Sequence, residues 1–379
     1  MNFLQQTSSQ SKLSQSCRSL SGPAEGMFML DHIDELSLNS LNQHENKSTL
    51  LKVSANTISN NPQDNTPTFL KLYYASICVC EELLETKIHH WQKETDIDIT
   101  VYIEKSLYKT LGVSYRLPNF AENSLSGSNE WIKGKLIDLN KRSIKPKFIV
   151  MKIVFSLITA KNRKEKMLRI VQNLSEIAKE LQENSLVPVI EVRFKDDEVE
   201  DLKELTVLMR AFLAELIFGF QNKEVYLEAI ILSLSITGQR FVKIDKDWQM
   251  DYFVERIVFL NYIVWIRTIP AAIPTILINE GEYRGEEDFA NHCKILHEMY
   301  HLKLPCPWNV HYCAGRMLYQ TILEQYEADK DSSIYFASLF NTRVKTLHDC
   351  YLGALDPEKF KESDGVGPQD FKILYAEDM

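Results

Sequence analysis

Short apolar runs alternate along the chain with longer stretches in which apolar residues recur every three or four positions. The runs are mostly apolar throughout, which is typical of parallel strands covered by helices. They fall at residues 26–31, 98–104, 113–117, 148–155, 187–192, 226–232, 271–279 and 307–313. Helical spacing occupies residues 67–88, 165–184, 199–221, 250–267, 285–302 and 315–326. Strands that alternate with helices predict the α/β class, and eight such strands are the number that closes a single (β/α)8 barrel, the TIM barrel.

The chain of 379 residues fits one such barrel. We expect the barrel to span residues 1–356. Residues 37–66 are rich in Asn, Ser, Gln and Thr and lack periodicity, so they predict a long polar loop or insertion after the first strand. Residues 357–379 contain Pro and Gly and predict an extended C-terminal tail.

Composition narrows the function classes. The net charge of −9 and the pI near 5.6 argue against nucleic-acid binding, which usually needs a basic face. No stretch of 18 apolar residues predicts a membrane span. The seven cysteines contain no CxxC pair and are odd in number, which predicts thiols in a reducing compartment. We therefore expect a cytoplasmic or cytoskeleton-associated protein; the first 24 residues carry only Lys12 and Arg18 as charges, which makes a mitochondrial transit peptide the weaker interpretation.

Two strand patterns and the helix between them resemble a known family. Val187-Pro-Val-Ile-Glu-Val192 and Tyr226-Leu-Glu-Ala-Ile-Ile-Leu232, with the helix 199–221, resemble strands five and six of the class I fructose-bisphosphate aldolases. In that family the second strand continues as Leu-Lys-Pro-Asn, and the lysine forms a Schiff base with the sugar ketone. Here residues 232–235 read Leu-Ser-Leu-Ser, so Ser233 replaces the lysine. A hydroxyl has no nitrogen with which to form an imine.

The resemblance extends from about residue 13 to residue 352 and implies several retained positions. Asp31 matches the catalytic aspartate of strand one, and Lys152 matches a lysine of strand four. Glu191 matches the first glutamate of the family's Glu-Pro-Glu sequence. Gly315 and Arg316 match the end of strand eight, where the family's arginine binds phosphate, so they imply a residual phosphate site.

Other positions depart from the family. Pro146 stands where strand four begins with a catalytic lysine, with Lys145 and Lys147 on either side of it. Arg193 replaces the second glutamate, and a permanent cation cannot act as acid or base at neutral pH. The phosphate-binding Ser-Gly-Gly turn of strand seven reads Asn279-Glu280-Gly281. A carboxylate about 4 Å from a phosphate costs on the order of 4 kcal/mol per charge pair at an effective dielectric of 20, so Glu280 disfavours the ligand.

One motif points to different chemistry. His297, Glu298 and His301 form HExxH, the helical zinc signature of metalloproteases, in which the glutamate serves as base for a zinc-bound water. Glu324 or Glu327 would have to supply a third ligand. In a barrel, however, this segment leads into strand eight at the face that serves stability, not catalysis.

The sequence thus predicts a pseudoenzyme of the aldolase type that acts as a structural or scaffold subunit of a larger assembly, with protein partners and no cofactor. A homo-oligomer is compatible with this prediction. The first alternative is an active fructose-bisphosphate aldolase of glycolysis that uses a displaced lysine, for which Lys152 is the candidate. The second is the zinc hydrolase of the HExxH motif. The identity of the partners, residual sugar-phosphate binding and the role of residues 37–66 stay open.

Overall fold

The structure is a computed structural model. It describes residues 26–30, 74–80, 110–117, 127–141, 144–156, 163–195, 199, 201–238, 241, 250–279, 286–299, 306–314, 347, 349 and 351–352. The predicted polar loop at 37–66 and the predicted tail at 357–379 lie outside these residues.

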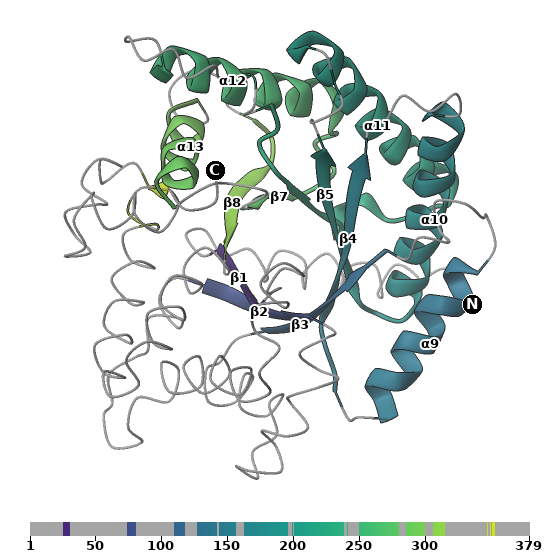
Figure 1. Ribbon diagram of the computed structural model, residues 1–379. Helices are drawn as coiled ribbons and strands as arrows, with labels where there is room; N and C mark the ends of the chain where they lie inside the picture. Colours follow the sequence, from purple (N-terminus) through teal and green to yellow (C-terminus); the bar gives the residue numbers. More distant parts are fainter. Residues whose placement is uncertain are drawn as a thin grey trace, which may run out of the picture.

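Eight parallel strands close into a barrel, as predicted (Figure 1). Each strand pairs with its neighbours in sequence, and the last strand pairs with the first, so the sheet has no free edge. The strands are β1 (Gly26–Leu30), β2 (Tyr74–Cys80), β3 (Thr110–Arg116), β4 (Phe148–Ser156), β5 (Val187–Lys195), β6 (Ile231–Leu234), β7 (Thr275–Asn279) and β8 (Asn309–Ala314).

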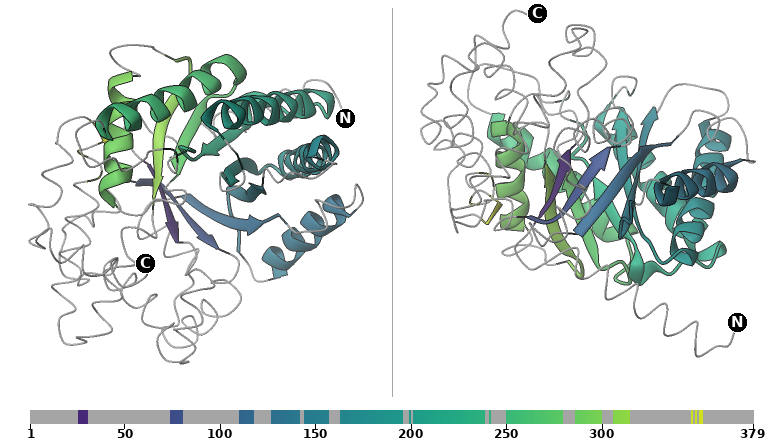
Figure 2. Two further views of the ribbon diagram at one scale, coloured as in Figure 1. Left: turned by 45° about the horizontal axis from the view of Figure 1, so that its top comes forward. Right: turned by 90° about the horizontal axis from the view of Figure 1, so that it is seen from below.

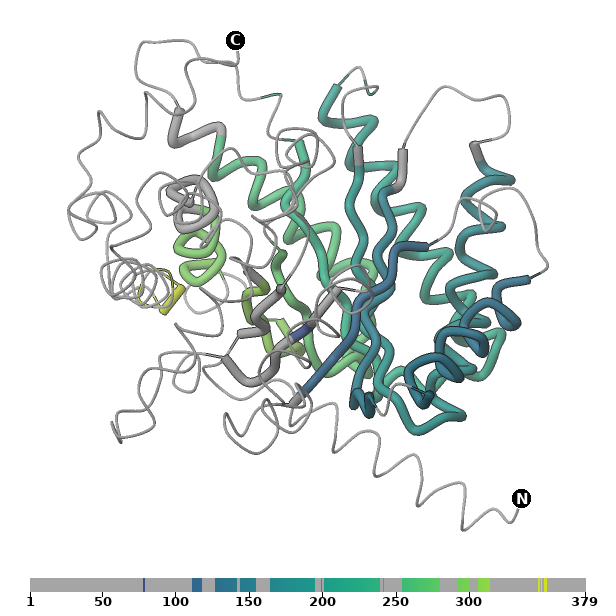
Figure 3. Tube along the Cα trace, turned by 60° about the horizontal axis from the view of Figure 1, so that its bottom comes forward, coloured from purple at the N-terminus to yellow at the C-terminus, as the bar shows by residue number. Residues whose placement is uncertain are grey.

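The described helices lie outside the strands (Figures 2 and 3). α11 packs against α10 on one side and α12 on the other. None of the helices within the described ranges is long and apolar enough to cross a membrane. The helices are α9 (Ser128–Lys141), α10 (Arg163–Glu183), α11 (Leu202–Asn222), α12 (Met250–Thr268) and α13 (Glu286–Glu298), with a short 3-10 turn, η3 (Leu227–Ala229), before β6.

The core has two layers because alternate residues of each strand face opposite sides of the sheet. One set packs inside the barrel, and the other set packs between the strands and the helices. The inner cluster contains Cys78, Phe148, Val150, Val187, Val189, Ala229, Ile231, Leu277 and Cys313. The outer cluster takes the intervening strand residues, such as Ile149, Met151, Ile190, Leu232 and Ile276. Burial on both faces explains why the strands read as continuous apolar runs.

Two element predictions were wrong, and one helix was missed. Residues 74–80, which fall inside the helix predicted at 67–88, form β2. The strand predicted at 226–232 begins only at Ile231, after η3. α9 was not predicted, since its few apolar residues are separated by lysines and polar residues. Periodicity cannot distinguish a short buried strand from a buried helix segment, which explains the first error. The strand predicted at 98–104 lies outside the described residues.

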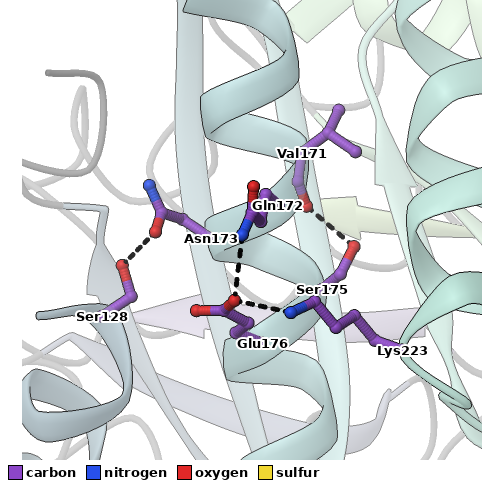
Figure 4. Close-up of polar contacts among 7 residues, drawn as sticks. All are labelled: Ser128, Val171, Gln172, Asn173, Ser175, Glu176 and Lys223. Carbon is purple, nitrogen blue, oxygen red and sulfur yellow. Dashed lines mark hydrogen bonds and ion pairs between the residues drawn. The ribbon is translucent and has the colours of Figure 1, made fainter. Parts of the chain in front are cut away.

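α10 connects the elements on either side of it (Figure 4). The Ser128 hydroxyl, at the start of α9, donates to Asn173 Oδ1 at 2.8 Å, and both side chains are buried. On the side of α11, Lys223 Nζ lies 2.7 Å from Glu176 Oε1. These contacts hold α10 between α9 and the end of α11, and α10 in turn connects β4 to β5.

Gly219 of α11 packs closely against α10. A Cβ atom added there would lie 2.6 Å from both Ser175 Oγ and Val171 Cγ1, whereas one added at Gly134 of α9 would meet nothing within 4 Å. We expect Gly219→Ala to lower the free energy of unfolding by about 1–2 kcal/mol, because overpacking outweighs the gain in helix propensity. Gly134→Ala, which adds only propensity, should raise the same quantity by about 0.5–1 kcal/mol. Urea unfolding measures both, and a Gly219→Ala variant as stable as Gly134→Ala would contradict the close packing.

Candidate functional site

A polar cluster lies toward the carboxyl ends of β4 to β7: Asn279 is the last residue of β7, Ser233 is next to the last of β6, and Lys152 and Glu191 are the central residues of β4 and β5. Glu191, Ser233 and Asn279 are each 1% exposed and Lys152 is 8% exposed. The residue two positions before each of them belongs to the inner cluster, and strand residues two apart face the same side. The four side chains therefore face the barrel interior. In a barrel of this kind, the carboxyl ends of the strands carry the chemistry.

The strand register orders this cluster. Arg116 of β3 is the register partner of Lys152, Lys152 is the partner of Glu191, and Glu191 is the partner of Ser233. Two cations, a carboxylate and a hydroxyl thus follow one another across four adjacent strands. Arg116 is exposed, whereas the other three are buried.

Ser233 is engaged by the neighbouring strand. Asn279 Nδ2 donates a hydrogen bond to Ser233 Oγ at 3.1 Å, and both side chains are buried. The hydroxyl therefore accepts from an amide across the β6 to β7 junction. Sequence reasoning treated these two residues separately, one as a lost nucleophile and the other as part of a degraded phosphate turn. Their contact depends on the stagger between β6 and β7, which the sequence does not specify.

Glu191 and Arg193 form an ion pair on one face of β5. Arg193 Nε donates to Glu191 Oε1 at 2.7 Å, with 22% of the arginine side chain exposed and 1% of the glutamate. The two residues are two apart on a strand, so their side chains leave the same face. One oxygen of the carboxylate is thereby occupied by a cation that can neither accept nor release a proton at neutral pH.

The lysines beside Pro146 do not join the cluster. Lys145 and Lys147 are exposed, and Pro146 lies before the start of β4. The backbone of Lys147 continues the strand ladder, since its N–H donates to the Leu111 carbonyl at 2.9 Å. The structure therefore places neither lysine in the buried cluster around Lys152.

Several predicted site residues follow strands directly in sequence but lie outside the described residues. Asp31 comes after the last residue of β1, Glu280 and Gly281 follow β7, and Gly315 and Arg316 follow β8. Their role as remnants of a ligand site stays a prediction.

The HExxH segment occupies the end of α13. His297 and Glu298 are the last residues of that helix and are half-buried, and His301 lies outside the described residues. α13 leads to the amino end of β8, away from the polar cluster at the carboxyl ends. Within the ranges that the structure describes, no three His, Cys, Asp or Glu side chains gather where they could hold a metal ion.

A closed parallel barrel with a buried polar cluster at its carboxyl ends defines the TIM-barrel class. The family model of the glycolytic class I fructose-bisphosphate aldolases matches residues 144–369, more than half of the chain. The chain therefore belongs to the class I fructose-bisphosphate aldolase family.

Individual relatives are distant. A cytosolic fructose-bisphosphate aldolase 6 of Arabidopsis thaliana is 26% identical over 175 residues, 46% of either chain. Fructose-bisphosphate aldolase B of Rattus norvegicus is 27% identical over 150 residues, 40% of this chain and 39% of the relative. The matched segments thus span less than half the length of these relatives.

A solved structure shows the same fold over almost the whole chain. It is the fructose-bisphosphate aldolase of Plasmodium falciparum in a ternary complex with TRAP and a small-molecule inhibitor. The TM-score is 0.71 at 17% identity, with 92% of this chain and 96% of that chain covered. At this identity the similarity establishes the barrel architecture alone.

Proposed function

We propose that this chain is a catalytically inactive member of the aldolase family that serves as a structural or scaffold subunit of a larger protein assembly in the cytoplasm or on the cytoskeleton. The observation that carries the proposal is Ser233. It replaces the Schiff-base lysine, and it is buried with its hydroxyl hydrogen-bonded to Asn279.

Two steps of the class I reaction, imine formation and proton transfer, lack the side chains that they need at this site. The class I reaction needs an amine that condenses with the ketone, and a hydroxyl cannot form the protonated C=N that accepts electrons. Proton transfer needs a group that can take up and release a proton, and Arg193 cannot do so at neutral pH. Residues of one catalytic unit act together, so the loss of the nucleophile is not compensated by those that remain.

An active aldolase that used Lys152 as its amine would have to bind the substrate in a different position. Lys152 lies on β4 and Ser233 on β6, two strands apart. Neighbouring strands are about 4.8 Å apart, so the amine would come from a strand roughly 10 Å away, and the ketone would have to be bound in a different position to meet it. A misplacement of about 1 Å already costs up to about 100-fold in rate, which favours the inactive reading over an active aldolase that uses Lys152.

Borohydride trapping tests the proposal. The natural protein is incubated with dihydroxyacetone phosphate and sodium borohydride, and its intact mass is measured, with cleavage of fructose 1,6-bisphosphate assayed in parallel. An active class I aldolase serves as the positive control. We expect no adduct and no cleavage. A trapped adduct would overturn the inactive reading, and its disappearance in Lys152→Met would assign it to that lysine.

The scaffold role has its own test. The full chain is tagged at its natural expression level, and the size of its complexes is measured before and after chemical crosslinking. We expect stable co-purification with a defined set of other proteins. Recovery of the chain only by itself, at the mass of a monomer or homo-oligomer, would contradict the scaffold role even if the chain is inactive.

A further inference from the structure

α9 and the residues that follow it are strongly basic. Residues 131–147 contain six lysines or arginines and a single acidic residue, Asp138, although the whole chain has a net charge of −9. Two of the lysines contact other parts of the chain. Lys133 Nζ lies 3.3 Å from Glu180 Oε2 of α10, and Lys135 Nζ lies over an aromatic ring of β3. The positive charge toward the start of α9 is therefore partly used within the chain.

Three further lysines lie at the amino end of the barrel. Lys141, Lys145 and Lys147 are exposed, and none of them forms an ion pair within the residues that the structure describes. The Ile144 N–H donates to the Leu139 carbonyl at 2.9 Å, so the chain folds back at the end of α9 and Lys145 lies beside the last turn. Lys147 precedes the inward-facing first residue of β4, so its side chain leaves the strand on the helix side. The three lysines thus lie on the same outer side of the barrel.

An exposed apolar side chain lies next to these lysines. Ile137 is 56% exposed and precedes Lys141 by four residues, which places both on one face of α9. One turn earlier, a Cβ atom added to Gly134 would meet nothing within 4 Å, so the surface beside Ile137 is open. α9 packs against α10 on one side and is the first of the described helices around the barrel (Figures 1 and 2). A partner that covers this surface must therefore bring both apolar atoms and negative charge.

We infer that this surface, formed by Gly134, Ile137, Lys141, Lys145 and Lys147, binds an acidic amphipathic helix of another protein. Such a helix presents apolar residues one turn apart to Ile137 and carboxylates to the lysines. Gly134 lets the partner approach α9 closely, since it has no side chain. A nucleic acid offers no apolar side chain, and the net charge of −9 repels a polyanion beyond the lysines.

The surface is separate from the aldolase site. It lies at the amino end of the barrel, whereas the polar cluster lies toward the carboxyl ends of the strands. The inference gives the proposed scaffold role a partner of defined chemistry, and it rests on that role only in this respect. An anionic membrane is the less favoured occupant, because anchoring in the lipid interface uses several apolar side chains and α9 exposes one large apolar side chain, Ile137.

Fluorescence anisotropy of a labelled synthetic peptide measures binding to the full chain. The peptide has about 16 residues of alanine and glutamate, with two leucines four positions apart on one helical face. We expect a dissociation constant on the order of 10–100 µM at ~50 mM salt, because the surface is small. The constant should rise by about 5-fold or more at ~300 mM salt, which screens the ionic contacts. The same peptide with lysine in place of glutamate should not bind.

Matched variants locate the binding surface. Ile137→Ser and Lys141→Glu should each raise the dissociation constant by about 5-fold or more, since one removes the apolar contact and the other places like charges together. Phe218→Ser and Lys203→Glu make the same kinds of change at exposed positions of α11 and should stay within about 2-fold of the natural protein. Circular dichroism checks that each variant keeps its fold, as expected for exposed positions.

Three results would overturn the inference: equal binding of both peptides, no binding of either, or variants at Ile137 and Lys141 that match the α11 controls. Cosedimentation with phosphatidylserine vesicles tests the other occupant. Retention on the vesicles without binding of the acidic peptide would assign the surface to a membrane and reject a protein partner. The assay uses the purified chain and a synthetic peptide, so its outcome does not depend on aldol cleavage or on co-purifying proteins. The two proposals can therefore fail separately.

Discussion

Arg193→Met should lower the free energy of unfolding by about 3 kcal/mol. The substitution keeps much of the aliphatic length of the side chain but removes the guanidinium that contacts Glu191 at 2.7 Å. Glu191 is 1% exposed, so the carboxylate would lose the Arg193 guanidinium while it remains buried. Removing one member of such a pair costs more than the pair contributes, because the remaining charge stays desolvated. Guanidinium chloride unfolding at neutral pH measures the change.

An exposed ion pair provides the matched control. Arg169 pairs with Glu165 one turn earlier on α10, and both side chains are substantially exposed. Arg169→Met should cost no more than about 0.5 kcal/mol, since such pairs are solvated and contribute little. If the two arginine variants lose the same stability, the interior pair is not desolvated in the way that the structure indicates.

The free energy of unfolding should fall by about 3 kcal/mol between pH 6.5 and pH 4 because of His311 alone. His311 is 3% exposed, and its Nδ1 lies 3.4 Å from the Tyr351 hydroxyl, which also contacts the Val310 carbonyl. Burial lowers the pKa of His311 from the usual 6.5 to about 4. The unfolded chain thus takes up a proton at a higher pH than the folded chain, so acid favours unfolding.

The pH dependence is measured by urea unfolding at several pH values above and below 6.5. His311→Gln cannot titrate, so it should show a shallower decline in stability over this range, whatever its stability at neutral pH. Equal declines in the natural protein and in His311→Gln would show that His311 is not buried in its neutral form.

The barrel could be predicted because its strands are buried on both faces. The unit from β5 through α11 to β6 shows this best, since its apolar runs and its helical stripe leave few alternative arrangements. β2 could not be distinguished from a helix, because seven residues of mixed apolar character fit either period. α9 was missed for a different reason: its helical pattern is weak because lysines interrupt its apolar residues.

The candidate site was predictable only in part. Alternation along β4 to β6 places Lys152, Glu191 and Ser233 on one face, which the sequence pattern alone implies. The contact between Ser233 and Asn279 depends on how far β7 is staggered relative to β6, and sequence spacing carries no such information. The contact between Glu191 and Arg193 follows from the rotamers of two long side chains on one strand.

The hydrogen bond between Ser233 and Asn279 bears on whether a lysine could be accommodated at position 233. The Asn279 amide presents a donor to the Ser233 hydroxyl, and a lysine ammonium has three donors and no acceptor. The ammonium of a lysine at position 233 would therefore face the Asn279 Nδ2 donor. The Asn279 side-chain amide would have to rotate by about 180° to present its oxygen instead. A lysine at position 233 thus requires coordinated changes on two strands, so under the proposed inactive function the packing of Ser233 and Asn279 opposes a return of the amine.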